Sequence, residues 1–283
     1  MKIIAALVAL TLPLTAQWLD HKDPRTPRTK DGKPNLAAPA PQMDGKPDLS
    51  GVWEAERTPL SDLKRVLGEE TAKVQVDLTD VTKYMINVFW DTKDSEQLLR
   101  PEAAALTKQR AGLDFVTARC WPAGVPAGQL VDPFKIIQAP RQLAVISGIG
   151  DPTRQIYTDG RSLPQDPVPS WMGSSVGRWQ GGTLVVETTG FTEKSWLDAF
   201  GHPRSSSMRI RERYRRRDFG HMDLEVMFDD PAYYTRPFSI QIQLDLLPDT
   251  DVLEYVCTDN EKDRTHVEKA STAAPPKVAE PVR

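Results

Sequence analysis

The feature that most constrains the fold is an alternation of apolar and polar residues in the second half of the chain. Apolar side chains occupy every second position of 222–228 and of 238–246, and a shorter run of the same kind spans 183–188. Successive side chains of a β-strand point to opposite faces of the sheet. Each run therefore predicts a strand with one buried face.

Turn sequences separate these runs at short intervals, which predicts that neighbouring strands pair as an antiparallel meander from Phe134 onward. The turns are Asp159-Gly160, Gly181-Gly182, Asp218–Gly220, Asp229–Pro231 and Pro248-Asp249. Closure of the meander would leave no exposed sheet edge. We therefore predict a mostly β fold that closes into a barrel or forms a strongly curled sheet.

Helical periodicity is confined to about residues 60–112. Ser61 can cap a first helix that Gly68 ends, and apolar residues three and four apart over 81–89 mark one face of a second helix. Pro101 can open a third. Two or three helices are therefore expected after the first strand, packed on the outside of the β-structure.

The first residues have the layout of a secretory signal peptide. A basic start at Met1-Lys2 precedes an apolar run over 3–14, and cleavage is expected after Ala16. The run is too short to span a bilayer, and no other stretch approaches about 18 apolar residues. We expect a periplasmic or secreted protein with no transmembrane anchor.

The two ends of the mature chain are expected to be irregular. Residues 17–47 are rich in Pro, Lys and Asp and repeat the motif DGKP at 31–34 and 44–47, of which only the second copy leads into a strand. This composition predicts a Pro-rich tether. The segment 263–283 has the same character and predicts a disordered tail, which leaves 48–262 as a single β-rich domain.

Charge and cysteine content bound the possible partners and the compartment. The net charge is −3 with both signs mixed along the chain, which does not suggest a nucleic-acid partner. In the basic run 209–217, charged residues alternate with apolar ones, as they do on a strand with one solvated face.

Cys120 and Cys257 predict one disulfide in an oxidising compartment. Two free buried thiols or a metal pair are the alternatives, although neither cysteine has a second ligand at metal-binding spacing.

Two resemblances add to this interpretation. Gly51-Val52-Trp53, ahead of a meander, resembles the entry strand of lipocalins and related calycin barrels, which implies a barrel with a small-ligand cavity.

The chain also resembles an uncharacterised family of exported bacterial proteins, abundant in acidobacteria. It departs from the usual pattern of that family at Ser174, Gln180, Gly182 and 204–206. The blocks that carry this second resemblance are DGKPDLSGVW (44–53), PFKIIQAP (133–140), RQIYTDGRSLPQDPVPSWMG (154–173), SVGRWQGGTLVVETTGF (175–191), RERYRRRDFGHMDLEVMFDDPAYYTRPF (211–238) and LLPDTDVLEYVC (246–257).

Glu212 and two histidines are the candidates for acid–base chemistry. Glu212 shares the strand face of apolar residues, so it either pairs with an arginine or acts as a carboxyl of raised pKa. His202 lies in a predicted loop, and His221 is expected to face solvent or a helix. We predict neither a metal nor a cofactor; were a metal present, the two histidines with Glu212 or Asp223 would be the ligands to test.

Aromatic residues gather in sequence around the Gly-rich hairpin. Trp171, Trp179, Tyr157 and Arg178, with Tyr214 from the next strand, are the candidate ligand-binding residues. Aromatic rings at a barrel mouth stack on sugars or hold apolar ligands, and they also cap cores. Three functions are open: an exported binder of an apolar or glycosidic small molecule, which we rank first; a barrel lyase, isomerase or hydrolase; and a cell-envelope interaction protein without a pocket. The sequence does not fix the oligomeric state.

Overall fold

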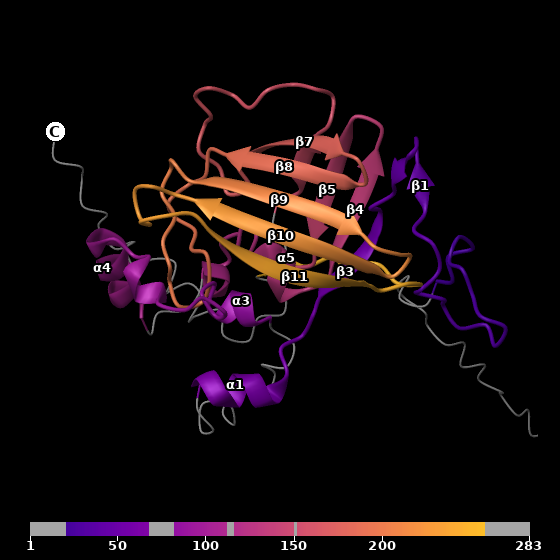
Figure 1. The fold of residues 1–283 in the computed structure, drawn as a ribbon, viewed down its shortest axis with the longest axis horizontal. Coiled ribbons are helices and arrows are strands. Elements are labelled where there is room, and N and C mark those ends of the chain that lie inside the picture. Colours follow the sequence, from indigo (N-terminus) through magenta and orange to yellow (C-terminus); the bar gives the residue numbers. More distant parts are fainter. Residues whose placement is uncertain (1–20, 68–81, 112–115, 150–151, 258–283) are drawn as a thin grey trace, which may run out of the picture.

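The computed structural model describes residues 21–67, 82–111, 116–149 and 152–257, and the centre of this part of the chain is a closed barrel of nine strands (Figure 1). Spatial order follows chain order, and the last strand returns to pair with the first. The mostly β, lipocalin-like barrel expected from the sequence is thus confirmed. Its strands are β3 (Gly51–Ala55), β4 (Phe134–Ala139), β5 (Gln142–Ser147), β6 (Arg154–Tyr157), β7 (Ser174–Gln180), β8 (Thr183–Thr189), β9 (Arg209–Arg216), β10 (His221–Asp229) and β11 (Phe238–Leu246).

One pair of neighbouring strands in the barrel is parallel. Nine strands cannot alternate in direction all the way around a closed ring, so at least one pair must run the same way. That pair is β6–β7, joined through Ile156–Ser175 and Tyr157–Val176, whereas the other eight pairs are antiparallel. A parallel pair requires the chain to travel back along the barrel. Residues 158–173, the return loop, do this and arch over β7 in Figure 1.

Alternation along the last three strands fills the barrel with apolar side chains. On β9, β10 and β11 every second residue is buried. Their inward positions include Leu224, Phe228 and Ile240, each at most 2 % exposed. The outward positions of β9 are exposed, including Arg211 and Arg213. The basic run therefore forms the solvated strand face that the sequence predicted.

Trp53 closes one end of the barrel on the first strand. Its ring is fully buried, and its indole N–H donates to the Leu49 carbonyl at 2.9 Å. The guanidinium of Arg216 lies 4.9 Å from the ring centre and donates to the Asp48 carbonyl at 2.5 Å. Burial lowers the pKa of Arg216 to about 10, so this residue remains charged at neutral pH. The Gly-x-Trp motif thus begins the barrel, as expected.

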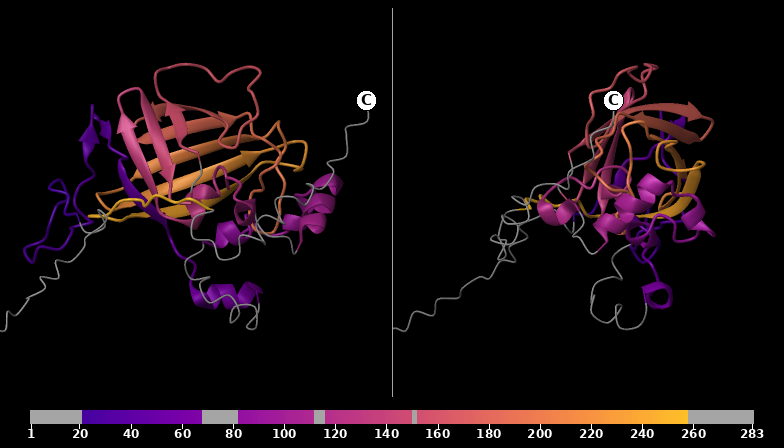
Figure 2. Two further views of the ribbon diagram at one scale, coloured as in Figure 1. Left: turned by 180° about the vertical axis from the view of Figure 1, so that it is seen from behind. Right: turned by 90° about the vertical axis from the view of Figure 1, so that its left-hand side faces the viewer.

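The helices lie between β3 and β4, and Figure 2 shows α1 and α4 outside the ring of strands. The helix expected over 81–89 is wrong in length, because α3 has only four residues. Beyond it, the Asn87 side chain accepts the Phe89 N–H, and Asp198 accepts the Val88 N–H, both at near-ideal distance. These bonds replace helical ones. The helical elements are α1 (Leu60–Leu67), α3 (Lys83–Ile86), η3 (Ser95–Gln97), α4 (Pro101–Arg110), η4 (Val116–Arg119) and α5 (Gly128–Val131).

The described part of the Pro-rich segment, 21–47, packs along one end of the barrel. Its chain folds into a hairpin of β1 (Gln42–Met43) and β2 (Lys46–Pro47). Arg28 forms an ion pair with Asp249 at 2.7 Å in the turn after β11. The described part of the Pro-rich segment is therefore anchored at Asp249, which accepts the Asp23 N–H and pairs with Arg28. The expected leader, 1–16, and tail, 263–283, lie outside the described residues.

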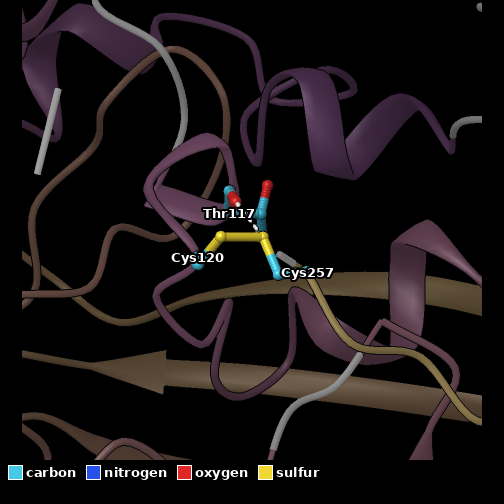
Figure 3. Close-up of a disulfide and its surroundings, with 3 residues drawn as sticks. All are labelled: Thr117, Cys120 and Cys257. Atoms are coloured by element: carbon cyan, nitrogen blue, oxygen red, sulfur yellow. Dashed lines mark hydrogen bonds between the residues drawn. A yellow bond between two sulfur atoms is a disulfide. The ribbon is translucent and has the colours of Figure 1, made fainter. Parts of the chain in front are cut away.

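The disulfide predicted from the sequence joins Cys120 to Cys257 (Figure 3). It links the end of η4 to the chain that follows β11 and spans 137 residues of sequence. The Cys257 sulfur lies 3.9 Å from the Thr117 carbonyl oxygen. The bond thus ties the last described residue to the segment that joins η4 to α5.

Candidate functional site

A charged pair lies inside the barrel. Arg154 at the start of β6 and Glu212 in β9 point inward, with side chains 1 % and 0 % exposed. Arg154 Nη1 donates to Glu212 Oε1 at 2.8 Å, and Nη2 donates to Glu212 Oε2. The two groups therefore form a bidentate ion pair shielded from solvent.

The remaining N–H groups of Arg154 also have acceptors. Nε donates to Ser175 Oγ at 3.2 Å, and Nη2 donates to Thr188 Oγ1 at 2.8 Å. Nη1 also points to Gln129 Oε1 at 3.4 Å. A guanidinium has five N–H donors, and all of them are engaged here. The desolvation of the charge is thus offset by a complete set of hydrogen bonds.

Tyr214 completes this arrangement from the same strand as Glu212. Its hydroxyl donates to Glu212 Oε1 at 2.7 Å and accepts a hydrogen bond from Gln129 at 3.0 Å. Burial and the negative charge of Glu212 raise the pKa of Tyr214 above its ordinary value. Burial opposes the charge on Arg154, but the charge and hydrogen bonds of Glu212 raise the pKa of Arg154 overall. We call these six residues the buried polar network: Gln129, Arg154, Ser175, Thr188, Glu212 and Tyr214.

The buried polar network crosslinks the weakest junction of the barrel. The parallel β6–β7 pair, which we call the seam, has only two residue pairs in its ladder. Arg154 in β6 bonds to Ser175 in β7, to Thr188 in β8 and to Glu212 in β9. The seam is therefore held from inside by side chains. Of the alternatives for Glu212, the ion pair with an arginine is the one present, and its partner comes from β6.

His202 pairs with a carboxylate at another place in the fold. Its Nδ1 lies 2.5 Å from Asp198 Oδ2, and its backbone N–H donates to Asp198 Oδ1 at 3.2 Å. The rings of Phe89 and Phe200 lie 4.7 and 6.3 Å away, centre to centre. This loop histidine is thus buried beside aromatic rings and hydrogen-bonded to a carboxylate four residues earlier in the chain.

The three acid–base candidates are not brought together. His221, half-buried at the start of β10, bonds through Nδ1 to Asp218 at 2.7 Å. Glu212 pairs with Val226, which is five residues beyond His221 and so about 16 Å along the strand. Among the described residues, no group of three or more His, Cys, Asp and Glu side chains is arranged to hold a metal ion.

An open groove of about 620 Å³ lies where the return loop meets the seam. Its floor includes Ser175, whose hydroxyl belongs to the buried polar network. The rest of its lining mixes aromatic and apolar side chains with polar ones, among which Arg161 is charged and Thr153, Gln155, Ser162, Ser170 and Ser174 are neutral. Lining residues that bear on ligand binding are Pro152, Tyr157, Arg161, Pro164, Trp171 and Met172.

The strand end and the return loop are fixed together at Tyr157. The guanidinium of Arg161 stacks on the Tyr157 ring at 3.7 Å and forms an ion pair with Asp159 at 2.7 Å. Hydrogen bonds from Arg161 lower the pKa of Asp159 to about 2. Tyr157 also donates its hydroxyl to Gln155 at 2.7 Å. One side of the groove is therefore a preformed platform of ring and guanidinium.

The backbone of Trp171 is held by a buried arginine. Arg204, 1 % exposed, donates to the Trp171 carbonyl at 3.1 Å and to the Val125 carbonyl at 3.0 Å. The indole ring lies 5.8 Å from the ring of Trp121 and remains partly exposed. Gly173, with φ +66°, lets the chain turn into β7 where a Cβ would lie 2.7 Å from the Thr189 carbonyl. Trp171 is thus positioned, but its face is not fully covered.

The five candidate ligand-binding residues are divided by the fold. Tyr157 and Trp171 line the groove together, whereas Tyr214 is buried in the polar network. Arg178 is exposed on β7, and Trp179 near the end of that strand packs beneath Lys46. Trp171 precedes β7 and Trp179 is at its other end, so these two rings cannot share one small ligand.

Sequence reasoning missed three residues that shape the site. Arg154 shares strand parity with the apolar Ile156 and so faces inward, a signal of the same kind as the one that singled out Glu212. Gln129 precedes the meander on α5 and gives no comparable pattern. Arg204 stood out only as a departure from a family pattern, yet it anchors the backbone beside the groove.

Comparisons with known proteins give no relative: no family model, no curated protein and no solved structure matches this chain. Within the described residues, no helix has the length and apolar character needed to cross a membrane.

Proposed function

We propose that this protein is an exported binder of a small molecule with a flat apolar face, such as an aromatic compound or a glycoside. The binding site is the groove between the return loop and the seam. Export is supported by the disulfide between Cys120 and Cys257, because such bonds persist in oxidising compartments.

The observation that carries this proposal is the pair of aromatic side chains in one preformed groove. Tyr157 is fixed by Arg161, and the backbone of Trp171 is fixed by Arg204, before any ligand arrives. A site that is already rigid loses little conformational freedom on binding. Flat apolar faces of ligands stack well on such rings, and the nearby guanidinium of Arg161 can donate a hydrogen bond to a polar substituent.

Binding is favoured over catalysis by the state of Glu212. Its carboxylate already accepts hydrogen bonds from Arg154 and Tyr214, and it lies inside the packed barrel. A general base needs access to a substrate proton. Among the described residues the groove meets the network only at Ser175, so the network supports the groove as structure.

Native mass spectrometry tests the proposal on protein recovered under gentle conditions from the cells that make it. We expect a co-purifying molecule on the wild-type chain and on Trp179→Ala, and its loss from Trp171→Ala. Trp179→Ala is the matched control because it removes a half-exposed indole at the far end of β7. Thermal melting of all three proteins checks that each is folded.

Two results would count against the proposal. One is a wild-type protein that carries no molecule under these conditions. The other is an equal mass increment on folded Trp171→Ala, because the ligand would then lie elsewhere.

A further inference from the structure

We infer that the barrel carries a second binding site, a cleft on its outer face that takes a neutral, hydroxyl-rich carbohydrate chain. The cleft has a volume of about 840 Å³ and lies over β9, β10 and β11, beside the segment that joins β3 to α1 and the start of α3. Its lining is disjoint from that of the groove. The inference therefore does not rest on the function proposed for the groove.

Strand register sets the polar groups of this cleft in two rows across the sheet. In the first row, Arg215, Asp223 and Gln243 are paired across β9 to β11. Thr183 on β8 lies one residue before the Leu184–Tyr214 pair, and at the other side the row ends at Glu56, whose N–H donates to the Gln243 carbonyl. Four strand spacings make this row about 19 Å long. Such a length suits an extended chain of sugars better than a single small ring.

The second row lies two residues along the strands. It consists of Arg213, Glu225 and Gln241 on β9, β10 and β11. Each of these positions faces outward, because the alternate positions of the same strands fill the barrel. The two rows together present hydrogen-bond donors and acceptors over a continuous surface, with the amides of Gln241 and Gln243 offering both.

Charges in the cleft are close to balanced and largely paired. Arg213 contacts Glu225 at 3.5 Å, and Lys83 contacts Asp91 at 2.5 Å. Such pairing leaves no strong field of one sign, which argues against a nucleic acid or another polyanion. The carboxylates of the lining are Glu56, Asp62, Asp91, Asp223 and Glu225, and its cations are Arg57, Lys83, Arg213 and Arg215.

Two buried hydroxyls in the cleft have no hydrogen-bond partner among the described residues. Thr58 and Thr82 both line it, each is 4 % exposed, and the Oγ1 atom of each is unsatisfied. A buried polar group without a partner is destabilising, so such groups are rare in proteins. A ligand that carries many hydroxyls would supply the missing partners. These two atoms are the observation that indicates a ligand.

Saturation-transfer difference NMR tests the inference with four neutral hexasaccharides: cellohexaose, maltohexaose, laminarihexaose and chitohexaose. We expect transfer to at least one of them at millimolar concentration, and its loss in the double variant Gln241→Ala/Gln243→Ala. Gln142→Ala is the matched control, because Gln142 is an exposed amide on β5 outside the lining of the cleft. Trp171→Ala should also retain binding, which separates this site from the groove.

A second pair of variants separates ligand binding from a role in folding. Thr58→Val/Thr82→Val removes only the two unpartnered hydroxyls and keeps the side-chain shape. We expect its melting temperature to equal or exceed that of the wild type, while carbohydrate affinity falls about 25-fold, which is about fivefold for each of the two lost hydrogen bonds. A melting temperature well below that of the wild type would assign the hydroxyls to the fold instead.

The inference is overturned if none of the four hexasaccharides gives transfer. It is also overturned if transfer persists undiminished in folded Gln241→Ala/Gln243→Ala, or if a heparin hexasaccharide binds more tightly than every neutral probe.

Discussion

At the scale of single residues, charges in this protein are fixed by specific partners, and their titration reports on the site. Asp159 illustrates this, because Arg161 both binds its carboxylate and covers the Tyr157 ring of the groove. The same contact that sets the pKa of Asp159 therefore sets the shape of the platform.

We predict that Arg161→Ala returns the pKa of Asp159 from about 2 toward its ordinary value of 3.8. Because the folded-state pKa is lowered, the stabilising contact is fully present above the ordinary pKa of the carboxyl. It is lost as the pH falls through about 2. Carboxyl chemical shifts followed by NMR from pH 6 to 1.5 measure both values. An identical midpoint in the variant would rule out Arg161 as the cause.

Glu212 gives a second prediction at this scale. Glu212→Gln leaves the charge of Arg154 buried without compensation, so it should destabilise the fold by about 3–5 kcal/mol. The double variant Arg154→Met/Glu212→Leu should lose less than the single variant, because no buried charge remains. Urea denaturation with the disulfide intact measures both. Should Glu212→Gln leave stability unchanged, the ion pair would not hold the seam.

At the scale of elements, the seam governs how the barrel closes. A nine-stranded ring imposes one parallel pair, and a parallel pair imposes a long return connection. The groove exists because that connection, residues 158–173, passes over the outside of β6 and β7. Topology, more than any single motif, therefore places Tyr157 and Trp171 together.

Gly173 and Gly181 provide a matched pair of variants at either end of β7. Both have positive φ, but a Cβ at 173 would meet the Thr189 carbonyl at 2.7 Å, whereas a Cβ at 181 would meet nothing within 4 Å. Gly181→Ala should cost about 1–2 kcal/mol from backbone conformation alone. Gly173→Ala adds overpacking and should cost about 2–5 kcal/mol.

Chemical denaturation compares these two variants directly. Equal losses of stability would mean that the strand start tolerates a Cβ and that the groove floor is less rigid than described.

At the scale of the whole molecule, the sequence predicted the barrel but not the parallel β6–β7 seam at which it closes. Alternation over 222–228 and 238–246 was sufficient for β10 and β11, because one face of each is buried and the other solvated. The direction of β7 was not predictable, since two residue pairs in a ladder leave no periodic signal. The disulfide was predictable from the even cysteine count together with the expected oxidising compartment.

The site was predicted only in part, for reasons of distance in sequence. Tyr157 and Trp171 are close along the chain, so their sharing of a groove follows from the turn region between them. Arg154 and Glu212 are 58 residues apart. The periodicity of each strand predicts that its own charged residue faces inward, but it does not predict which residue of another strand is the partner. Trp171 precedes β7 and Trp179 lies near the end of that strand, so the length of β7 separates the two rings.

A crystal structure of the protein isolated with its co-purified molecule would show directly whether the groove is the binding site. We predict that the molecule lies beneath the return loop, in contact with both Tyr157 and Trp171, and that the Arg154–Glu212 ion pair is unchanged. A molecule bound inside the barrel in place of that ion pair, or a groove left empty while the molecule sits elsewhere, would contradict this prediction.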